Sequence, residues 1–421
     1  MYGKRTRSNN NIIMPPIFDI YRKPIFDESI RKAEYRTYAP FIKSFYCNDI
    51  VEFSINQVYS FFAMSETLLC IKGSLEITGN GDVTLANNVG AFLFDSCMYS
   101  ESAREMETVR DPGIVSAVRA MTCYTQEDSN YMVMAGWNYP KDPILNAADH
   151  SFSIQMPLKH VFNIFNDYPL ITCGRQTIRL VRARNDNDCV VIKEKQNADK
   201  TTTVTTAKIN ITNIELRVKH IFPNDDIKLE LMKSTQQDQP IVIPFRKWEL
   251  HELPAITRGA RREVWAVKTS TSVERPRYVI VFFQTNKRDK TTADPTLFDN
   301  VNIQSIRLSL NGEYWPNERM QLDFSKTDYN EAYFNYTEFY PSYIHSQQKR
   351  PLLDFSAFKT HALFVIDCSK QEESMKASTV DVKLDIEANN GFPDNTKAYC
   401  IIIHDCVMEY FPLTEIVKSL N

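Results

Sequence analysis

The amino-acid sequence predicts an all-β protein, and its composition supports this fold class in three ways. The chain has 421 residues, of which 43% are apolar and 24% charged, the balance of a globular protein with room for more than one domain. It contains 25 Phe and 20 Tyr but only 11 Gly. The aromatic and β-branched residues occur in short runs separated by polar turns, a pattern that favours strands over helices.

Charge and cysteine content narrow the function classes. Lys and Arg number 49 against 52 Asp and Glu, a net charge of −3, so we expect weak or no direct binding of nucleic acid. The nine cysteines are scattered, without a Cys-x-x-Cys spacing, which indicates a reducing compartment. Because no apolar run approaches the length of a membrane helix or follows the basic start of the chain, we expect neither a cleaved secretion signal nor a transmembrane segment.

Residues 1–40 are predicted to form an extended N-terminal arm without a core of its own. The segment is polar, begins with basic residues and is interrupted by four prolines, each of which disfavours helix at the residue before it. Lys4, Arg5 and Arg7 are candidates for contact with nucleic acid or with a neighbouring chain. A plain solvated terminus carries such charges too, and this alternative stays open.

Residues 41–235 are predicted to form a first β-sandwich. Asn80-Gly81 predicts a hairpin, because both central positions of such a turn need positive φ. Two helices interrupt the strands: Asp111-Pro112 supplies the start of one, and apolar residues at helical spacing over 158–165 predict the other. Strands are expected at Ile50–Val58, Thr67–Ile77, Val89–Phe94, Gln176–Arg182, Thr202–Ile211, Ile214–Ile221 and Ile227–Met232.

A polar stretch at 234–240 is the predicted boundary, and residues 236–421 form a second sandwich. Val380–Glu387 alternates between apolar and polar residues, so we expect one face of that strand to be buried and the other to face solvent. Each half has about 190 residues, enough for two sheets with eight strands. The connections at 268–277 and 324–362 are long, which favours jelly-roll connectivity over an up-and-down barrel. Other strands are expected at Ile241–Phe245, Glu263–Lys268, Tyr278–Gln284, Ile303–Leu310, Ala362–Asp367 and Ala398–His404.

Six short runs carry a similarity to a known family: Asn87–Asp95, Arg277–Gln284, Phe298–Gly312, Tyr314–Pro316, Leu363–Gln371 and Val380–Ile386. Together they resemble the double jelly-roll major capsid proteins of eukaryotic DNA viruses and of polinton-like or adintovirus-like elements, including copies in invertebrate genomes. The resemblance implies two tandem eight-stranded jelly-roll sandwiches, with a few short helices in loops. Sparse glycine departs from the pattern and leaves the turns of the second sandwich undefined.

The same resemblance implies a function. Three chains would form a pseudo-hexagonal capsomer, and capsomers would tile an icosahedral shell. The insertions at 99–150 and 325–361 would be surface loops or clasps between subunits. Penton or minor capsid proteins would be further partners, no cofactor would be needed, and the protein would reside in the virion capsid after assembly inside the host cell.

An aromatic segment within the second of these insertions is the candidate contact between subunits. It places seven aromatic residues within 15 positions, too many for a solvated loop, and Tyr is favoured at interfaces because it joins a large rigid ring to a polar tip. Equally, the segment could fold back over its own sandwich. Its members are Tyr329, Tyr333, Phe334, Tyr336, Phe339, Tyr340 and Tyr343.

Catalytic motifs do not emerge, and we expect a protein that is not an enzyme. His251-Glu252 is followed by Pro254, where a zinc-protease helix would have to continue, and neither a P-loop nor a nucleophile elbow occurs. On one extended strand Cys400 and Cys406 would lie about 20 Å apart, too far to share one metal ion. Two other functions stay open: a tandem sandwich that binds carbohydrate or a receptor without catalysis, and a cupin-like metalloenzyme, for which the seven histidines are widely dispersed.

Overall fold

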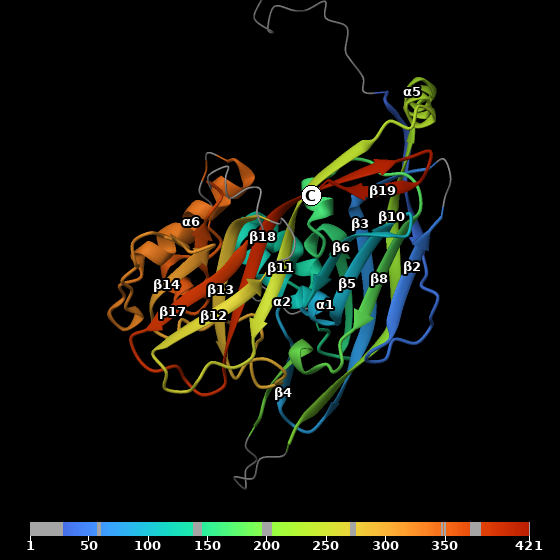
Figure 1. Cartoon of the computed structure of the whole chain (residues 1–421). Coiled ribbons are helices and arrows are strands. Elements are labelled where there is room, and N and C mark those ends of the chain that lie inside the picture. Colours follow the sequence, from blue (N-terminus) through green and yellow to red (C-terminus); the bar gives the residue numbers. More distant parts are fainter. Residues whose placement is uncertain are drawn as a thin grey trace, which may run out of the picture.

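The computed structural model describes residues 28–56, 60–137, 145–195, 204–269, 275–346, 348, 351–370 and 380–420. These residues form two β-sandwiches that lie side by side, one from each half of the chain (Figure 1). The all-β fold class is therefore confirmed. Among the helices within these ranges, none combines the length and the apolar character that crossing a membrane requires.

The first sandwich consists of two four-stranded antiparallel sheets. One sheet has the order β1 (Ile30–Tyr38), β10 (Thr206–Pro223), β3 (Phe61–Thr78) and β7 (Ser151–Pro157). The other has the order β2 (Ile50–Ile55), β8 (Gln176–Arg182), β5 (Phe94–Glu101) and β6 (Arg104–Arg110).

The second sandwich has the same construction. Its first sheet has the order β11 (Ile241–Leu253), β18 (Thr396–Phe411), β13 (Pro276–Thr285) and β16 (Phe364–Asp367). Its second sheet has the order β12 (Arg262–Thr269), β17 (Asp381–Ala388), β14 (Ile303–Leu310) and β15 (Glu313–Trp315).

Strand order identifies both sandwiches as jelly rolls. Counted along the chain within each half, the eight main strands pair as first, eighth, third and sixth in one sheet and as second, seventh, fourth and fifth in the other. This is the wrapped arrangement of a jelly roll: successive strands alternate between the sheets except for the fourth and fifth, which pair as a hairpin, and the last strand returns beside the first. The two halves therefore repeat one topology, which the sequence suggested only through architecture.

Alternating burial explains how the sheets close on their cores. In β8 every second residue is buried, and β17 buries Val382, Leu384, Ile386 and Ala388 while the residues between them are partly or fully exposed. A period of two places one face of each strand against the opposite sheet. β17 was predicted from this alternation to within a residue of its bounds, and β8 has the bounds that the sequence predicted.

Three further strands extend the sandwiches and correct the predicted hairpin. β4 (Asp82–Leu85) pairs with β9 (Val190–Lys193), and β19 (Ile416–Ser419) pairs with the end of β18. Asn80-Gly81 does lie at a turn, but the strands on either side of it, β3 and β4, pair with β10 and β9 rather than with each other. The positive φ of this turn falls on Gly79, at 115°.

Three stretches predicted as strand or arm have other structures. Val89–Phe92 is the short helix α1, preceded by Asn88 in the left-handed region, whose side chain donates to the carbonyl of Gly113 at 2.8 Å. Asp225–Gln236 is the helix α5, although Ile227–Met232 alternates like a strand. Residues 30–38 of the predicted arm pair as β1 along the edge of the first sheet.

The predicted helix at 158–165 is replaced by two short turns of helix, η3 (Leu158–His160) and α4 (Ile164–Asp167). The helix after Asp111 is confirmed as α2. The remaining helical elements of the described chain are α2 (Pro112–Cys123), α3 (Gln126–Tyr131), η2 (Met132–Ala135), η4 (Asn187–Cys189), η5 (Phe324–Lys326), α6 (Asn330–Ile344) and α7 (Phe355–Phe358).

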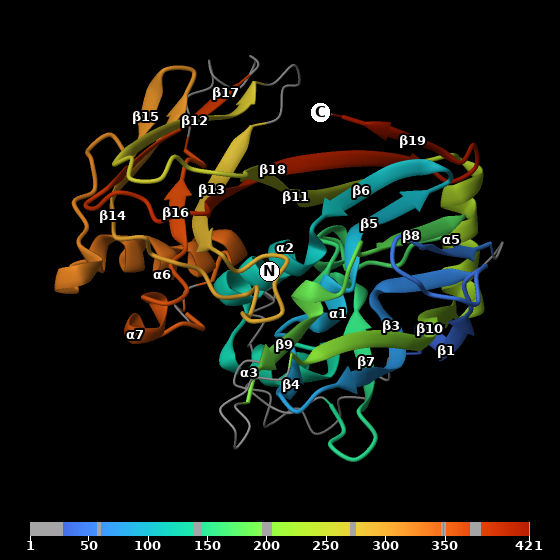
Figure 2. The ribbon, with the colours of Figure 1, turned by 90° about the horizontal axis from the view of Figure 1, so that it is seen from below.

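Much of the described part of the two insertions, 99–150 and 325–361, is helical and packed against the jelly rolls rather than surface loop. α2 is buried along nearly its whole length and lies between the two jelly rolls, together with α1 (Figures 1 and 2). α6 occupies much of the second insertion and packs against β16 of its own jelly roll and against α2 of the other. The expectation of loops there is wrong, because both segments carry apolar stripes that the chain itself covers.

Candidate assembly surfaces

Arg246, on β11 of the second jelly roll, and Asp167, at the end of α4 in the first, form a two-point ion pair across the joint between the jelly rolls. The Nε and Nη2 atoms of Arg246 donate to Asp167 at 2.9 and 2.8 Å, and its backbone N–H donates to the same carboxylate at 2.9 Å. The guanidinium also lies 3.6 Å from the ring centre of Tyr343. Burial alone would lower the pKa of Arg246, but the hydrogen bond to Asp167 and the charges of its neighbours together outweigh burial and raise that pKa, so the guanidinium stays charged.

Arg288 forms a second clamp between the same two bodies. Its side chain, largely buried, lies 2.8 Å from Asp111 and 3.0 Å from Asp188, both in the first jelly roll. Burial raises the pKa of Asp188, and the charge of Arg288 opposes that shift. Two bidentate or branched arginine contacts fix the relative orientation of the jelly rolls, because guanidinium geometry restricts rotation as well as distance.

The predicted aromatic segment forms α6, and four of its seven side chains are buried within this chain. Tyr329, Tyr336, Phe339 and Tyr343 each expose about 2% of their surface. Tyr336 donates to the carbonyl of Met121 at 2.6 Å, which ties α6 to α2 across the joint. Phe339 and Tyr343 pack edge-on against Trp248. These four side chains thus have no surface to offer a partner, and the alternative in which the segment covers its own sandwich accounts for them.

The other three aromatic residues of the segment are more accessible. Phe334 exposes 56% of its surface, while Tyr333 and Tyr340 are partly exposed. Tyr333 donates to the carbonyl of Leu353 at 3.2 Å. Contact between subunits stays a proposal for Phe334 and Tyr340, on the outer side of α6. The basic candidates Lys4, Arg5 and Arg7 lie outside the described residues.

The most exposed aromatic side chains of the described chain lie in the segment before β2. Phe41 exposes 74% of its surface and Tyr46 70%, and Ile50 at the start of β2 is also exposed. We call these three residues the β2 patch. The sequence did not identify these residues because they precede the first run of alternating apolar and polar residues. The available signal was several aromatic residues close together in sequence without helical or strand spacing. Exposed aromatic side chains are enriched at protein interfaces.

The outer face of the second jelly roll combines charge with exposed apolar side chains. Arg262 and Arg319 form ion pairs with Asp385 and Glu387 across β12, β17 and the segment after β15. On the same sheet, Val264 and Tyr314 are exposed, and Arg307 stacks 4.0 Å from the ring centre of Tyr314. Salt bridges of this exposure contribute little to stability but can orient an approaching partner.

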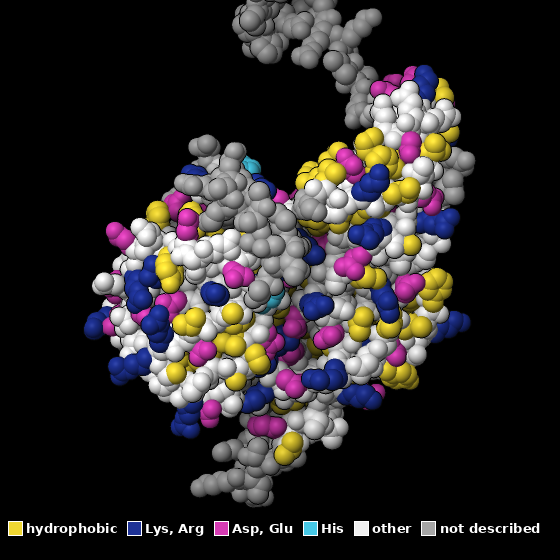
Figure 3. All heavy atoms as spheres, viewed as in Figure 1, with side chains coloured by type: hydrophobic (Ala, Val, Ile, Leu, Met, Phe, Trp, Pro, Cys, Tyr) yellow, Lys and Arg dark blue, Asp and Glu magenta, His cyan; other side chains and the backbone are white. Residues whose placement is uncertain are grey.

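A third apolar surface surrounds the end of β18. Val242, on β11, and the C-terminal residues Leu413, Ile416 and Leu420 are exposed on strands that pair side by side. Figure 3 shows hydrophobic side chains gathered along the first part of β11, near α5. The described residues contain no group of three His, Cys, Asp or Glu side chains placed to hold a metal ion.

A buried acid lies beneath the end of β18. Glu101 is 1% exposed; its Oε1 accepts from Gln176 at 3.1 Å, and its Oε2 has no hydrogen-bond partner among the described residues. Burial raises the pKa of Glu101 to about 8, so the carboxyl is largely protonated at neutral pH. Tyr410, near the end of β18, packs close by against Gly174. The first jelly roll therefore holds a neutral acid next to the last long strand of the second.

Comparison with known proteins agrees with this architecture. A family model for the double jelly roll-like domain matches residues 83–408, which is most of the chain. The protein therefore belongs to the double jelly roll-like domain family, as the resemblance implied. No curated protein matches the sequence.

Solved structures share the fold at low sequence identity. A chain of the Sputnik virophage structure has a TM-score of 0.68 at 9% identity and covers 100% of this chain and 95% of its own. The mavirus major capsid protein has a TM-score of 0.59 at 10% identity, covering 100% and 96%. The Faustovirus major capsid protein has a TM-score of 0.58 at 10% identity, covering 94% and 92%. The similarity therefore extends over both jelly rolls and their joint.

Proposed function

We propose that the protein is a major capsid protein, of which three copies form a pseudo-hexagonal capsomer. The observation that carries the proposal is the repetition of one strand order in two jelly rolls held at a fixed angle by buried contacts. Three such chains around a threefold axis present six lobes of nearly equal shape. A six-lobed body can pack beside its copies in a continuous layer, which a body with one lobe per chain does not provide.

The exposed apolar surfaces support assembly. The β2 patch lies on the first jelly roll, and Val264 and Tyr314 lie on the second, so each chain offers contact area on both bodies. Different surfaces on two sides of one chain make a head-to-tail contact, which closes into a ring when the rotation per subunit is right. Stable obligate interfaces bury roughly 2,000 Å² or more, so several such surfaces must act together.

In this proposal capsomers join into an icosahedral shell, and the protein resides in the virion capsid. Penton or minor capsid proteins would fill the positions that a six-lobed capsomer cannot occupy, because an icosahedral shell has fivefold vertices. The protein acts through contact surfaces rather than catalysis. Its named structural neighbours from mavirus and Faustovirus are described as major capsid proteins, which supports the same role here.

Negative-stain microscopy of the purified chain tests the proposal. We expect threefold particles or closed shells. A stable monomer at micromolar concentration would overturn the assignment, and glycan binding by that monomer would favour a carbohydrate-binding sandwich. Phe41→Ser should reduce the particle fraction, whereas Lys43→Ser, an exposed change in the same loop, should leave it unchanged.

A further inference from the structure

A groove of about 510 Å³ opens between the two jelly rolls at the end of the molecule that carries α5. One wall is α5, the facing wall is the turn from β18 to β19, and the floor is the start of β3 together with the residues before β8. Its lining is largely apolar and includes Phe61, Met232, Tyr410, Pro412 and Leu413. We call it the α5 groove.

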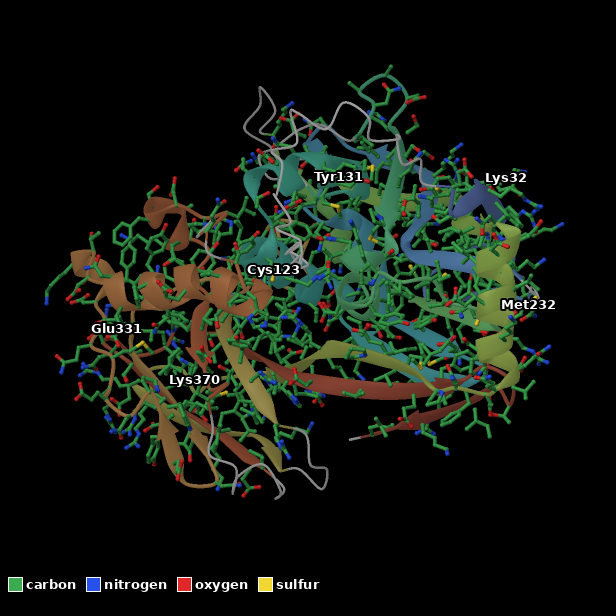
Figure 4. The ribbon with its side chains drawn as sticks, turned by 90° about the horizontal axis from the view of Figure 1, so that it is seen from above. Lys32, Cys123, Tyr131, Met232, Glu331 and Lys370 are labelled. Carbon is green, nitrogen blue, oxygen red and sulfur yellow. The ribbon has the colours of Figure 1, made fainter. Side chains whose placement is uncertain are left out.

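The rest of the described chain covers α5 only in part, with Ile227, Leu231 and Met232 half-buried. No side chain of its 12 residues is buried against the described residues, and Leu229 exposes 56% of its surface. Figure 4 shows Met232 on α5 at the side of the molecule far from Glu331 on α6. A helix of this length is marginal in water unless an apolar face packs against something. The residues of α5 that line the groove, Lys228, Met232, Thr235 and Gln236, follow one face.

We propose that residues 12–26 of the same chain bind in the α5 groove. This segment carries apolar residues in closely spaced groups, of which Ile17-Phe18 and Ile25-Phe26 are the largest pairs. Pro15, Pro16 and Pro24 favour extended backbone, the form that lies along a groove. The segment thus supplies the apolar surface that α5 lacks.

The path of the chain favours this groove. The N-cap residue of α5, Asn224, donates its backbone N–H to the carbonyl of Ser29 at 2.9 Å. β1 runs antiparallel to β10, with Ile30 opposite Pro223, so the chain before Ile30 continues in the direction in which β10 leads into α5.

Length makes the contact feasible within one molecule. α5 is roughly 18 Å long, and each extended residue spans up to about 3.5 Å, so five to six residues cover it from end to end. From Ser29, Ile25-Phe26 can therefore reach the near end of the groove and Ile17-Phe18 its far end. The tether gives the segment an effective concentration near the millimolar range, which favours binding to its own groove over exchange with another copy.

Binding there would fasten the two jelly rolls together. The segment precedes the first jelly roll, α5 follows its last strand, and the facing wall of the groove belongs to the second. The segment would act as an apolar strap on the outside of the joint. It would add to the largely buried ion pairs of Arg246 and Arg288, which join the same two jelly rolls. This proposal does not depend on the capsid assignment, because it concerns contacts within one chain.

Photo-cross-linking of the full chain tests it. Benzoylphenylalanine placed at Met232 is expected to capture residues 12–26, identified by mass spectrometry after proteolysis. The matched control is benzoylphenylalanine at Glu230, on the opposite face of α5, which should not capture that segment. Capture at equal yield from both faces, or none at Met232, would overturn the proposal.

Co-expression of two distinguishable chains tests whether residues 12–26 bind the groove of their own chain or that of another copy. The probe-bearing chain is co-expressed with a probe-free chain that carries Ile13→Val as a mass label. Binding within one copy gives cross-links to the Ile13 peptide alone. Cross-links to both peptides in proportion to expression would show exchange between copies and contradict the proposal.

Hydrogen exchange provides a measurement without a probe. The double change Ile17→Ser and Phe18→Ser is expected to speed exchange of the α5 amides at least about tenfold, because it removes two apolar side chains from the groove. The control pair Asn9→Ser and Asn10→Ser should leave the rate unchanged. Unchanged α5 exchange in the first variant would count against the proposal.

Discussion

The helices α5 and α6 are of similar length and differ in what covers them. α6 has 15 residues and buries Ala332, Tyr336, Phe339 and Tyr343, whereas α5 has 12 and buries none against the described chain. Helix stability in proteins comes mainly from packing of an apolar face, so the described residues secure α6 far more than α5. The difference separates residues that hold the fold from residues that remain available for binding.

The largest expected effect is in α6. Phe339→Ala should lower the free energy of unfolding by roughly 3–5 kcal/mol, because it leaves a cavity beside Trp248 and Tyr278. Phe334→Ala, the same change on the exposed side of the helix, should change it by less than about 0.5 kcal/mol. Urea unfolding of the two variants measures both values. Equal losses would contradict the division of α6 into a buried and an exposed face.

A smaller effect is expected beside the α5 groove, at Glu101. Its pKa is raised to about 8 in the folded chain from an ordinary value of 4.5, so the folded state keeps a proton that the unfolded state loses. The free energy of unfolding should therefore fall as pH rises from about 4.5 to about 8 and then level off. Glu101→Gln removes this loss and should stabilise the protein by about 3 kcal/mol at pH 7.

Unfolding in urea at several pH values measures the effect of Glu101→Gln. Parent and variant should be equally stable below pH 4.5 and diverge above it. Parallel curves of unfolding free energy against pH for the two proteins would show that Glu101 is ionised in the folded chain. That result would refute a protonated Glu101 carboxyl beneath Tyr410.

The clamp that holds α6 to the first jelly roll should show an intermediate effect. Asp167→Asn breaks the ion pair with Arg246, whose guanidinium also donates to the carbonyl of Tyr343 at 2.5 Å. Because Arg246 is partly exposed, we expect a loss of only about 2 kcal/mol. The double variant with Arg246→Met should lose less than the sum of the single losses. Additive losses in this cycle would mean that the pair does not couple the two bodies.

The smallest effect is expected in α5. Leu229→Ser should change the free energy of unfolding by less than about 0.5 kcal/mol, because the side chain is exposed. Tyr336→Ser in α6 is the matched change at a buried position and should cost several times more. A large loss at Leu229 would mean that α5 is covered in the free molecule by contacts beyond those of the described chain.

The strands could be predicted wherever one face is buried. β8 and β17 alternate strictly, and their bounds were found to within a residue. The same rule failed at Ile227–Met232, where the alternation of apolar and charged residues coincides with a helix that has no fully buried residue. In such a segment the pattern carries no information about burial, so period alone cannot decide between strand and helix.

The aromatic segment was harder to assign, although a signal existed. Ala332, Tyr336, Phe339 and Tyr343 recur at spacings of four, three and four, which is the stripe of a helix, but Pro341 lies inside it and argues against helix. Which aromatic side chains face a partner could not be predicted, because that depends on how α6 lies against α2, a contact between residues more than 200 positions apart.

Sedimentation of the purified chain by analytical ultracentrifugation tests the central claim most directly. If the two jelly rolls make each chain a two-lobed subunit of a capsomer, the smallest stable species should have three times the chain mass of 48.8 kDa. Closed shells should sediment as much larger species. A single species of 48.8 kDa at micromolar concentration would contradict the claim.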